Sequence, residues 1–252
     1  MSNPRPHFLD SQHIALVTQV NRICPLCDKE LFYKKNGKSF KRYEIAHIYP
    51  LNPTPIEAIL LQHEKRLSSD VNHEDNLIPL CAACHLEFDK PRTTEEYNQL
   101  HDIKKGLIKN ASHYAVMSQY QIEEDIRHVV DSLYSSDPLP EAAIAFDLKE
   151  INEKLDGTIN NLTKRKIQSN VTDYYFLIKQ RFADLDAANP DSANLISAQI
   201  KAYYLKQRNT CDSQQEIFKN IVTWINMRTR PKTIEVAEII ASFFVQNCEV
   251  FE

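Results

Sequence analysis

Residues 75–89 have the sequence DNLIPLCAACHLEFD, and this stretch decides the interpretation of the first part of the chain. The pair Cys81 and Cys84 is followed directly by His85. From Cys81 the residues can form a helix as far as Asp89, and side chains four positions apart share one helix face. We therefore expect His85 and Asp89 to lie side by side.

A second pair of cysteines has the same spacing, in the sequence CPLC at residues 24–27. Two intervening residues let both sulfurs of a pair turn toward one ion, and two such pairs complete a tetrahedral four-thiolate site. We therefore predict structural Zn²⁺ held by Cys24, Cys27, Cys81 and Cys84. The alternatives are two unrelated pairs of buried cysteines and a thioredoxin-like redox site, whose βαβ setting neither pair has.

A β-hairpin is predicted between the two cysteine pairs. Asn36-Gly37 is a strong signal for a tight turn, because both central residues of that turn need positive φ. The flanking residues 30–33 and 40–45 are rich in aromatic and β-branched side chains.

The same region is basic: residues 29–42 contain six lysines and arginines and one acid, Glu30. A local basic ribbon is what binding to a phosphate backbone requires. The alternative is a solvated, lysine-rich hairpin. The residues predicted to contact DNA are Lys34, Lys35, Lys38, Lys41 and Arg42.

The composition is typical of soluble globular proteins, with 42% hydrophobic and 25% charged residues. No stretch approaches a membrane-spanning length, and the first residues lack a signal-peptide pattern. We therefore expect a cytoplasmic protein without a membrane partner. In that compartment six cysteines favour a metal site over a disulfide framework.

Two domains are expected, residues 1–110 and 111–252. The first has 15 Lys and Arg against 14 Asp and Glu, a charge of +1, and the second has 15 against 20, a charge of -5. Beyond residue 110 apolar residues recur at helical spacing, which predicts five to seven helices around a core. Two such stripes are Ile122-Ile126-Val129-Leu133 and Ile217-Ile221-Trp224-Ile225.

The motifs of the first domain resemble one known family in their order and spacing. A CxxC pair, the sequence AHI at 46–48, DNLIPLC at 75–81 and CxxCH at 81–85 resemble the HNH endonucleases with four zinc-binding cysteines. The similarity covers about residues 22–92. It implies a small, zinc-stapled ββα-metal domain, so the fold class expected for the whole chain is α+β, with a mainly helical second domain.

The resemblance also implies roles for individual residues. His47 occupies the position of the general base that takes a proton from the attacking water. Asn76 occupies the middle position, where the amide ties a loop and orients the histidine strand. His85 matches the ligand of the catalytic divalent metal, and Asp89 fits the second ligand position on the same helix.

One position departs from the family pattern. Many members have a metal-binding Asp or His directly before the general base, and here that residue is Ala46. Glu44 projects from the same strand face and is a candidate substitute, although an ion pair with Arg42 or Lys41 is an equal alternative. Such a site suits Mg²⁺ or Mn²⁺, while histidine-rich versions tolerate Zn²⁺ or Ni²⁺.

The apolar C-terminal residues 238–252 end in QNCEVFE and resemble C-terminal domains of ABC three-component, Lamassu-like, bacterial anti-phage defence systems. The resemblance implies an effector nuclease restrained by an SMC-like ABC-type ATPase and a small middle subunit, with homo-oligomerisation possible on activation. So apolar a terminus is expected to pack in the core or against another protein.

Three functions are therefore open. The first is an HNH endonuclease that cuts double-stranded DNA as a defence effector. The second is a standalone, site-specific endonuclease of the restriction or homing type. The third is a zinc-knuckle DNA-binding module whose nuclease site has decayed, an interpretation that only Ala46 encourages.

Overall fold

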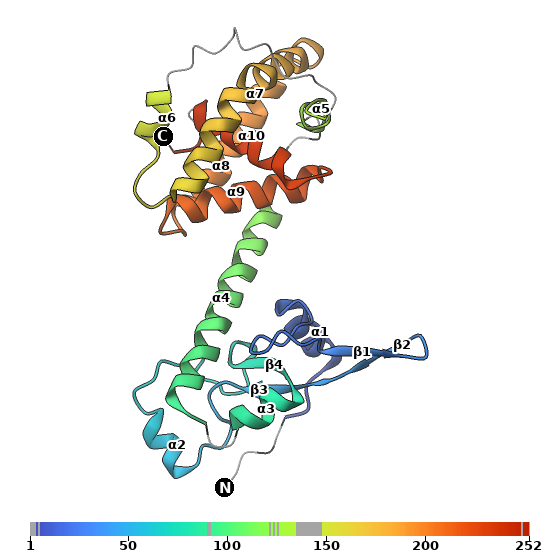
Figure 1. The fold of residues 1–252 in the computed structure, drawn as a ribbon, viewed down its shortest axis with the longest axis vertical. Coiled ribbons are helices and arrows are strands. Elements are labelled where there is room, and N and C mark those ends of the chain that lie inside the picture. The colour runs from blue at the N-terminus through green and yellow to red at the C-terminus, as the bar shows by residue number, and fades with distance from the viewer. Residues whose placement is uncertain are drawn as a thin grey trace. The chain divides into compact units, whose positions relative to one another are not determined.

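The computed structural model describes residues 4, 6–89, 92–120, 122, 124, 126–134, 148–247 and 249–251. The chain divides into two compact units, residues 1–115 and 116–252 (Figure 1). The first unit mixes helices with two small sheets and the second is helical, so the predicted α+β fold class is confirmed.

The first unit has a short N-terminal helix, two two-stranded sheets and the helices that cover them. In chain order its elements are α1 (Asp10–Gln19), β1 (Phe32–Lys35), β2 (Lys38–Lys41), β3 (Tyr43–His47), α2 (Pro55–Leu60), the 3-10 turn η1 (Glu74–Asn76), β4 (Leu77–Cys81), α3 (Ala82–Asp89) and α4 (Thr94–Gln119), which continues past the division between the units.

Strands β1 and β2 form the predicted hairpin, with Phe32 opposite Lys41 and Lys35 opposite Lys38. The two turn residues, Asn36 and Gly37, have φ of 51° and 73°. Both values lie in the left-handed region that a two-residue hairpin turn requires. The turn predicted from Asn-Gly is confirmed.

The predicted extent of the second hairpin strand, residues 40–45, is wrong, because these residues are divided between two sheets. Strand β2 ends at Lys41, and β3 pairs antiparallel with β4, with Tyr43 opposite Cys81 and His47 opposite Leu77. Burial explains the division. Every residue of β2 is exposed, whereas the last three residues of β3 are buried, and β4 gives them a partner strand within the core.

Helix α2 is short and lies at the surface of the first unit. It begins with a capping box between Thr54 and Glu57 and ends at Leu60. None of its residues is buried, while Leu61 just beyond it is only 2% exposed. With no apolar face held against the core, nothing stabilises further turns.

Helix α3 packs against β3 and β4, and this contact forms the centre of the first unit (Figure 1). The main apolar cluster beneath it includes Leu31, Ile48, Leu80, Phe88 and Tyr97. The helix predicted over 81–89 is thus confirmed, and it holds His85 close to the strand that carries His47.

In the second unit, the described residues form α5 (Ile126–Ser132), α6 (Leu148–Lys154), α7 (Asn161–Ala188), α8 (Ser192–Arg208), α9 (Gln214–Thr229) and α10 (Ile234–Gln246). Helix α10 packs against α7 and α9 (Figure 1). The predicted stripe on α9 is buried in the core, where Trp224 stacks on Tyr203 with ring centroids 4.3 Å apart.

The apolar C-terminal segment lies in the core of the second unit. Of the two predicted alternatives, packing in the core or against another protein, the structure shows packing in the core. Val245, Val250 and Phe251 are all at most 5% exposed. In the part of the chain that the structure describes, helices long and apolar enough to cross a membrane are absent.

Candidate active site and metal centre

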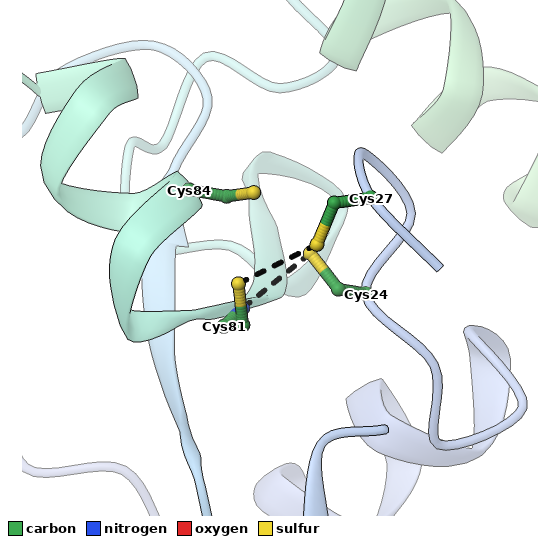
Figure 2. A group of neighbouring side chains, drawn as sticks. All are labelled: Cys24, Cys27, Cys81 and Cys84. Carbon is green, nitrogen blue, oxygen red and sulfur yellow. Dashed lines mark hydrogen bonds between the residues drawn. The ribbon is translucent and has the colours of Figure 1, made fainter. Parts of the chain in front are cut away.

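The four cysteines predicted to bind zinc converge from two segments of the first unit. Figure 2 shows Cys24 and Cys27, from the turn after α1, facing Cys81 at the end of β4 and Cys84 in the first turn of α3. All four sulfurs lie within 4.8 Å of one another, and the Sγ atoms of Cys27 and Cys81 are 3.6 Å apart. Zn–S bonds of about 2.3 Å in a tetrahedron place sulfurs roughly 3.8 Å apart. The geometry fits a structural zinc site.

The protonation of these thiols is mutually dependent. Burial raises the pKa of Cys24 and that of Cys84. Burial opposes ionisation of Cys81 too, yet hydrogen bonds from the Cys84 backbone and the neighbouring thiols lower its pKa to about 7. Four thiolates this close repel one another, so all four sulfurs can be ionised together only with a cation between them.

Three of the residues assigned to catalysis or to the catalytic metal line a cleft of about 430 Å³ in the first unit. His47, at the end of β3, lines this cleft together with His85 and Asp89 of α3. The pairing of β3 with β4 and the direct continuation of β4 into α3 bring the two histidines to one opening.

Asn76 lies immediately before β4 and is 2% exposed. Its Oδ1 accepts a hydrogen bond from the backbone N–H of Tyr49 at 2.8 Å. Its Nδ2 donates to the carbonyl oxygens of Tyr49, at 2.9 Å, and Val71, at 2.8 Å. The amide therefore ties the chain just after His47 to the segment leading into β4.

His47 is held both at its ring and at its backbone. Its Nε2 lies 3.1 Å from Oδ1 of Asn72, and its backbone oxygen accepts a hydrogen bond from Arg92 at 3.2 Å. An amide oxygen only accepts hydrogen bonds, so Nε2 is the protonated nitrogen in this arrangement. The lone pair of the neutral ring is then on Nδ1.

Two carboxylates approach one nitrogen of His85. Its Nδ1 lies 3.7 Å from Oε2 of Glu44 and 3.7 Å from Oδ2 of Asp89. Adjacent ligands of an octahedral ion with bonds of about 2.1 Å lie roughly 3 Å apart. The donor atoms of these three described residues do not all lie within 4.8 Å of one another. Shared binding of one ion therefore requires side-chain rotations.

The donor set still suits a hard divalent cation, because one imidazole and two carboxylates supply nitrogen and oxygen ligands. Ala46 is fully buried among apolar side chains and offers no ligand. Glu44 lies on the opposite face of β3 from His47. Its side chain contacts His85, which lines the cleft.

Two charged residues of the cleft, Arg92 and Glu57, escaped the sequence analysis. The Arg92 side chain is 4% exposed and donates to Oδ1 of Asp89 at 2.7 Å, and it lies 3.7 Å from a Glu57 oxygen. Its Nε is buried without a hydrogen-bond partner. No sequence motif indicated these two residues. Arg92 meets α2, β3 and α3 only because the fold brings those elements together.

The five cations predicted to contact DNA are all exposed, and they lie on or next to the β1–β2 hairpin rather than in the cleft. Within the described part of the chain, none of them lies within 4.0 Å of a carboxylate oxygen. Their cationic groups are therefore available to an external anion.

The fold and the site of the first unit are those expected of an HNH endonuclease domain with a four-cysteine site. Comparison with known families agrees, since residues 24–94 match the family described as HNH endonuclease. Residues 114–251 match a family described as C-terminal domain 11 of the ABC-three component (ABC-3C) systems. That match covers more than half of the chain, which therefore belongs to this family. Comparison with curated proteins finds no match.

Proposed function

We propose that the protein is a metal-dependent endonuclease that hydrolyses phosphodiester bonds of double-stranded DNA. The observation that carries this proposal is the single cleft shared by His47, His85 and Asp89, beside a four-cysteine site. The cleft combines a nitrogen base with a set of metal-binding side chains, which is what metal-assisted hydrolysis needs.

In the proposed mechanism His47 is the general base. Its Nε2 donates to Asn72, so Nδ1 accepts the proton of the attacking water. Asn76 holds the backbone after His47 in place and has a positional role.

His85 and Asp89 would hold the catalytic divalent ion, with Glu44 in place of the ligand missing at Ala46. Such an ion, Mg²⁺ or Mn²⁺ and alternatively Zn²⁺ or Ni²⁺, stabilises negative charge on the phosphate and on the leaving oxygen. Arg92 engages one oxygen of Asp89, and the other oxygen faces His85. Arg92 thereby orients the carboxylate toward the other proposed ligand.

The second unit supports a role within a larger assembly, because its family is found in ABC-3C systems. We propose that residues 111–252 dock on an SMC-like ATPase and a small middle subunit of a Lamassu-like anti-phage system, in the cytoplasm. These partners hold the nuclease inactive until invading DNA is sensed, and release or homo-oligomerisation then activates it.

Cleavage of plasmid DNA by the purified protein, alone and with copurified partners, tests the proposal. Activity is expected with Mg²⁺ or Mn²⁺ and not with chelator. His47→Ala should lower the rate at least about a hundredfold, the usual contribution of a general base. His63→Ala, an exposed histidine of the same unit, serves as the matched control.

Three outcomes separate the alternatives. Equal cleavage by His47→Ala and the parent protein contradicts the assignment of the base. Discrete fragments from a complex DNA substrate favour a site-specific endonuclease. Tight DNA binding without cleavage under every metal and partner condition favours a decayed site, in line with the buried Ala46.

A further inference from the structure

The β1–β2 hairpin is exposed on both faces. It forms a two-stranded sheet of its own, separate from the β3–β4 sheet. Seven of its eight strand residues are exposed, and Phe32 alone is half-buried. A two-stranded hairpin is marginally stable in water without a packed face. One face of this hairpin is therefore open to solvent and is not packed against the rest of the first unit.

That face carries an aromatic pair. Tyr33 and Phe40 lie directly opposite each other and stack with ring centroids 5.4 Å apart at an interplanar angle of 26°. They remain 36% and 42% exposed. The guanidinium carbon of Arg42 lies 4.9 Å from the centroid of the Tyr33 ring, so a cation extends the aromatic surface.

The tip of the same face is strongly cationic. Lys35 and Lys38 are directly opposite each other, an arrangement of like charges that disfavours strand pairing. Binding of an anion at the tip removes this repulsion. Aromatic rings flanked by cations complement a duplex groove, which presents thymine methyl groups and base edges on its floor and phosphates along its edges.

From these features we infer that the β1–β2 hairpin enters the major groove of duplex DNA as a two-stranded ribbon. The inference rests on the proposed function and specifies how the substrate is held. Tyr33 and Phe40 contact the bases and sugars of the groove, while the lysines and Arg42 pair with phosphates along its edges.

The width and length of the hairpin fit the major groove and not the minor groove. Paired strands are about 4.8 Å apart between backbone axes, so with their side chains they exceed a minor groove of about 6 Å. The major groove is about 12 Å wide and admits a two-stranded β-ribbon. Strands of four residues extend about 13 Å, enough to span its depth of about 8.5 Å.

Binding of the full-length, zinc-loaded protein to a short fluorescent duplex, measured by anisotropy over a range of salt concentrations, tests the inference. The double variant Tyr33→Thr/Phe40→Thr keeps β-branched residues in the strands and removes both rings. It should bind about tenfold more weakly with an unchanged salt slope, because it loses apolar contacts in the groove and no phosphate contact. Lys35→Gln/Lys38→Gln should instead lower the salt slope by about 2.

The groove is tested with a second duplex whose cytosines carry glucosylated 5-hydroxymethyl groups, which fill the major groove only. The parent protein should lose about tenfold in affinity on this duplex, and Tyr33→Thr/Phe40→Thr should lose little more than it has already lost. Tyr114→Ala removes an aromatic side chain that is 53% exposed elsewhere in the first unit and should behave like the parent. Zinc content and far-UV circular dichroism verify that each variant is folded.

Each contrary result is distinct. If the parent binds and cleaves DNA but the aromatic variant binds equally well, the inference is overturned and the proposed function stands. Equal loss by parent and variant on the modified duplex, or tighter binding to a single strand, overturns the groove assignment. A parent protein without DNA affinity overturns the proposed function together with the inference.

Discussion

A single buried arginine connects three elements around the cleft. Arg92 contacts Glu57 of α2, the backbone of His47 on β3 and Asp89 of α3, and its guanidinium carbon lies 4.4 Å from the Phe88 ring centroid. Burial lowers the pKa of Arg92, and the carboxylates of Asp89 and Glu57 oppose that shift. Both carboxylates lose a counter-charge if this side chain is removed.

Arg92→Gln should therefore affect both metal binding and stability. We expect an unfolding free energy lower by about 2 kcal/mol, since Asp89 is partly exposed and the pair is partly screened. Mn²⁺ affinity, measured by calorimetry without DNA, should fall about tenfold because Asp89 is no longer oriented. Arg66→Gln, which removes an exposed arginine stacked on Tyr49, is the control. Unchanged Mn²⁺ binding would assign Arg92 a purely structural role.

The buried Asn76 amide makes three hydrogen bonds to the backbone. Asn76→Ala leaves their partners unsatisfied and should lower the unfolding free energy by about 3 kcal/mol in urea denaturation. Cleavage should fall although His47 is intact, because the segment after β3 is released. A variant of parental stability would contradict the positional role.

Lys104 gives a prediction about pH. Its side chain is buried, Nζ donates to Gln19 at 2.6 Å, and burial lowers its pKa to about 8 despite the opposing effect of Asp75 and Glu74. Between pH 8 and about 10.5 the unfolded state binds more protons at this group, so its contribution to stability rises with pH. Relative to Lys104→Met, the parent should gain up to about 3 kcal/mol over that range in denaturant titrations. An identical pH dependence in both proteins would contradict this account.

At the level of elements, the four-cysteine site joins the turn after α1 to the junction of β4 and α3. Those segments are more than fifty residues apart in sequence, and an ion held by all four sulfurs would tie them together. Structural zinc contributes folding free energy directly.

Zinc removal should therefore unfold the first unit and leave the second folded. Chelator or Cys81→Ser is expected to abolish the unfolding transition of the first unit in calorimetry, while the transition of the helical unit persists. Cys211→Ser, which changes a half-buried cysteine of the second unit, is the control. Loss of both transitions together would show that the two units do not fold independently.

For the whole molecule, the division into two units places the cleft and the four-cysteine site in the first unit and the core of the ABC-3C family match in the second. The core around α7, α9 and α10 is made of residues from the second unit alone. A fragment of residues 116–252 should fold cooperatively and retain the partner proteins on copurification, while cleavage activity requires residues 1–115. Retention of partners by the nuclease unit alone would contradict the proposed docking role.

Much of this organisation is readable from local spacing. Two CxxC pairs, Asn36-Gly37, and the separation of His85 and Asp89 by one helical turn each specify a geometry within a few residues of backbone. Such patterns predicted the cysteine cluster, the hairpin turn and helix α3, and the HNH resemblance indicated three of the residues that line the cleft, His47, His85 and Asp89.

Contacts between segments distant in sequence were decided only by the tertiary structure. The alternation of residues 40–45 could not reveal that β3 leaves the hairpin to pair with β4, because burial selects the partner strand. Likewise, the approach of Glu44 to His85 and the bridging by Arg92 depend on how α2, β3 and α3 pack. The sequence by itself determined which residue types were available and their local spacing, while packing of the apolar core determined which of them meet.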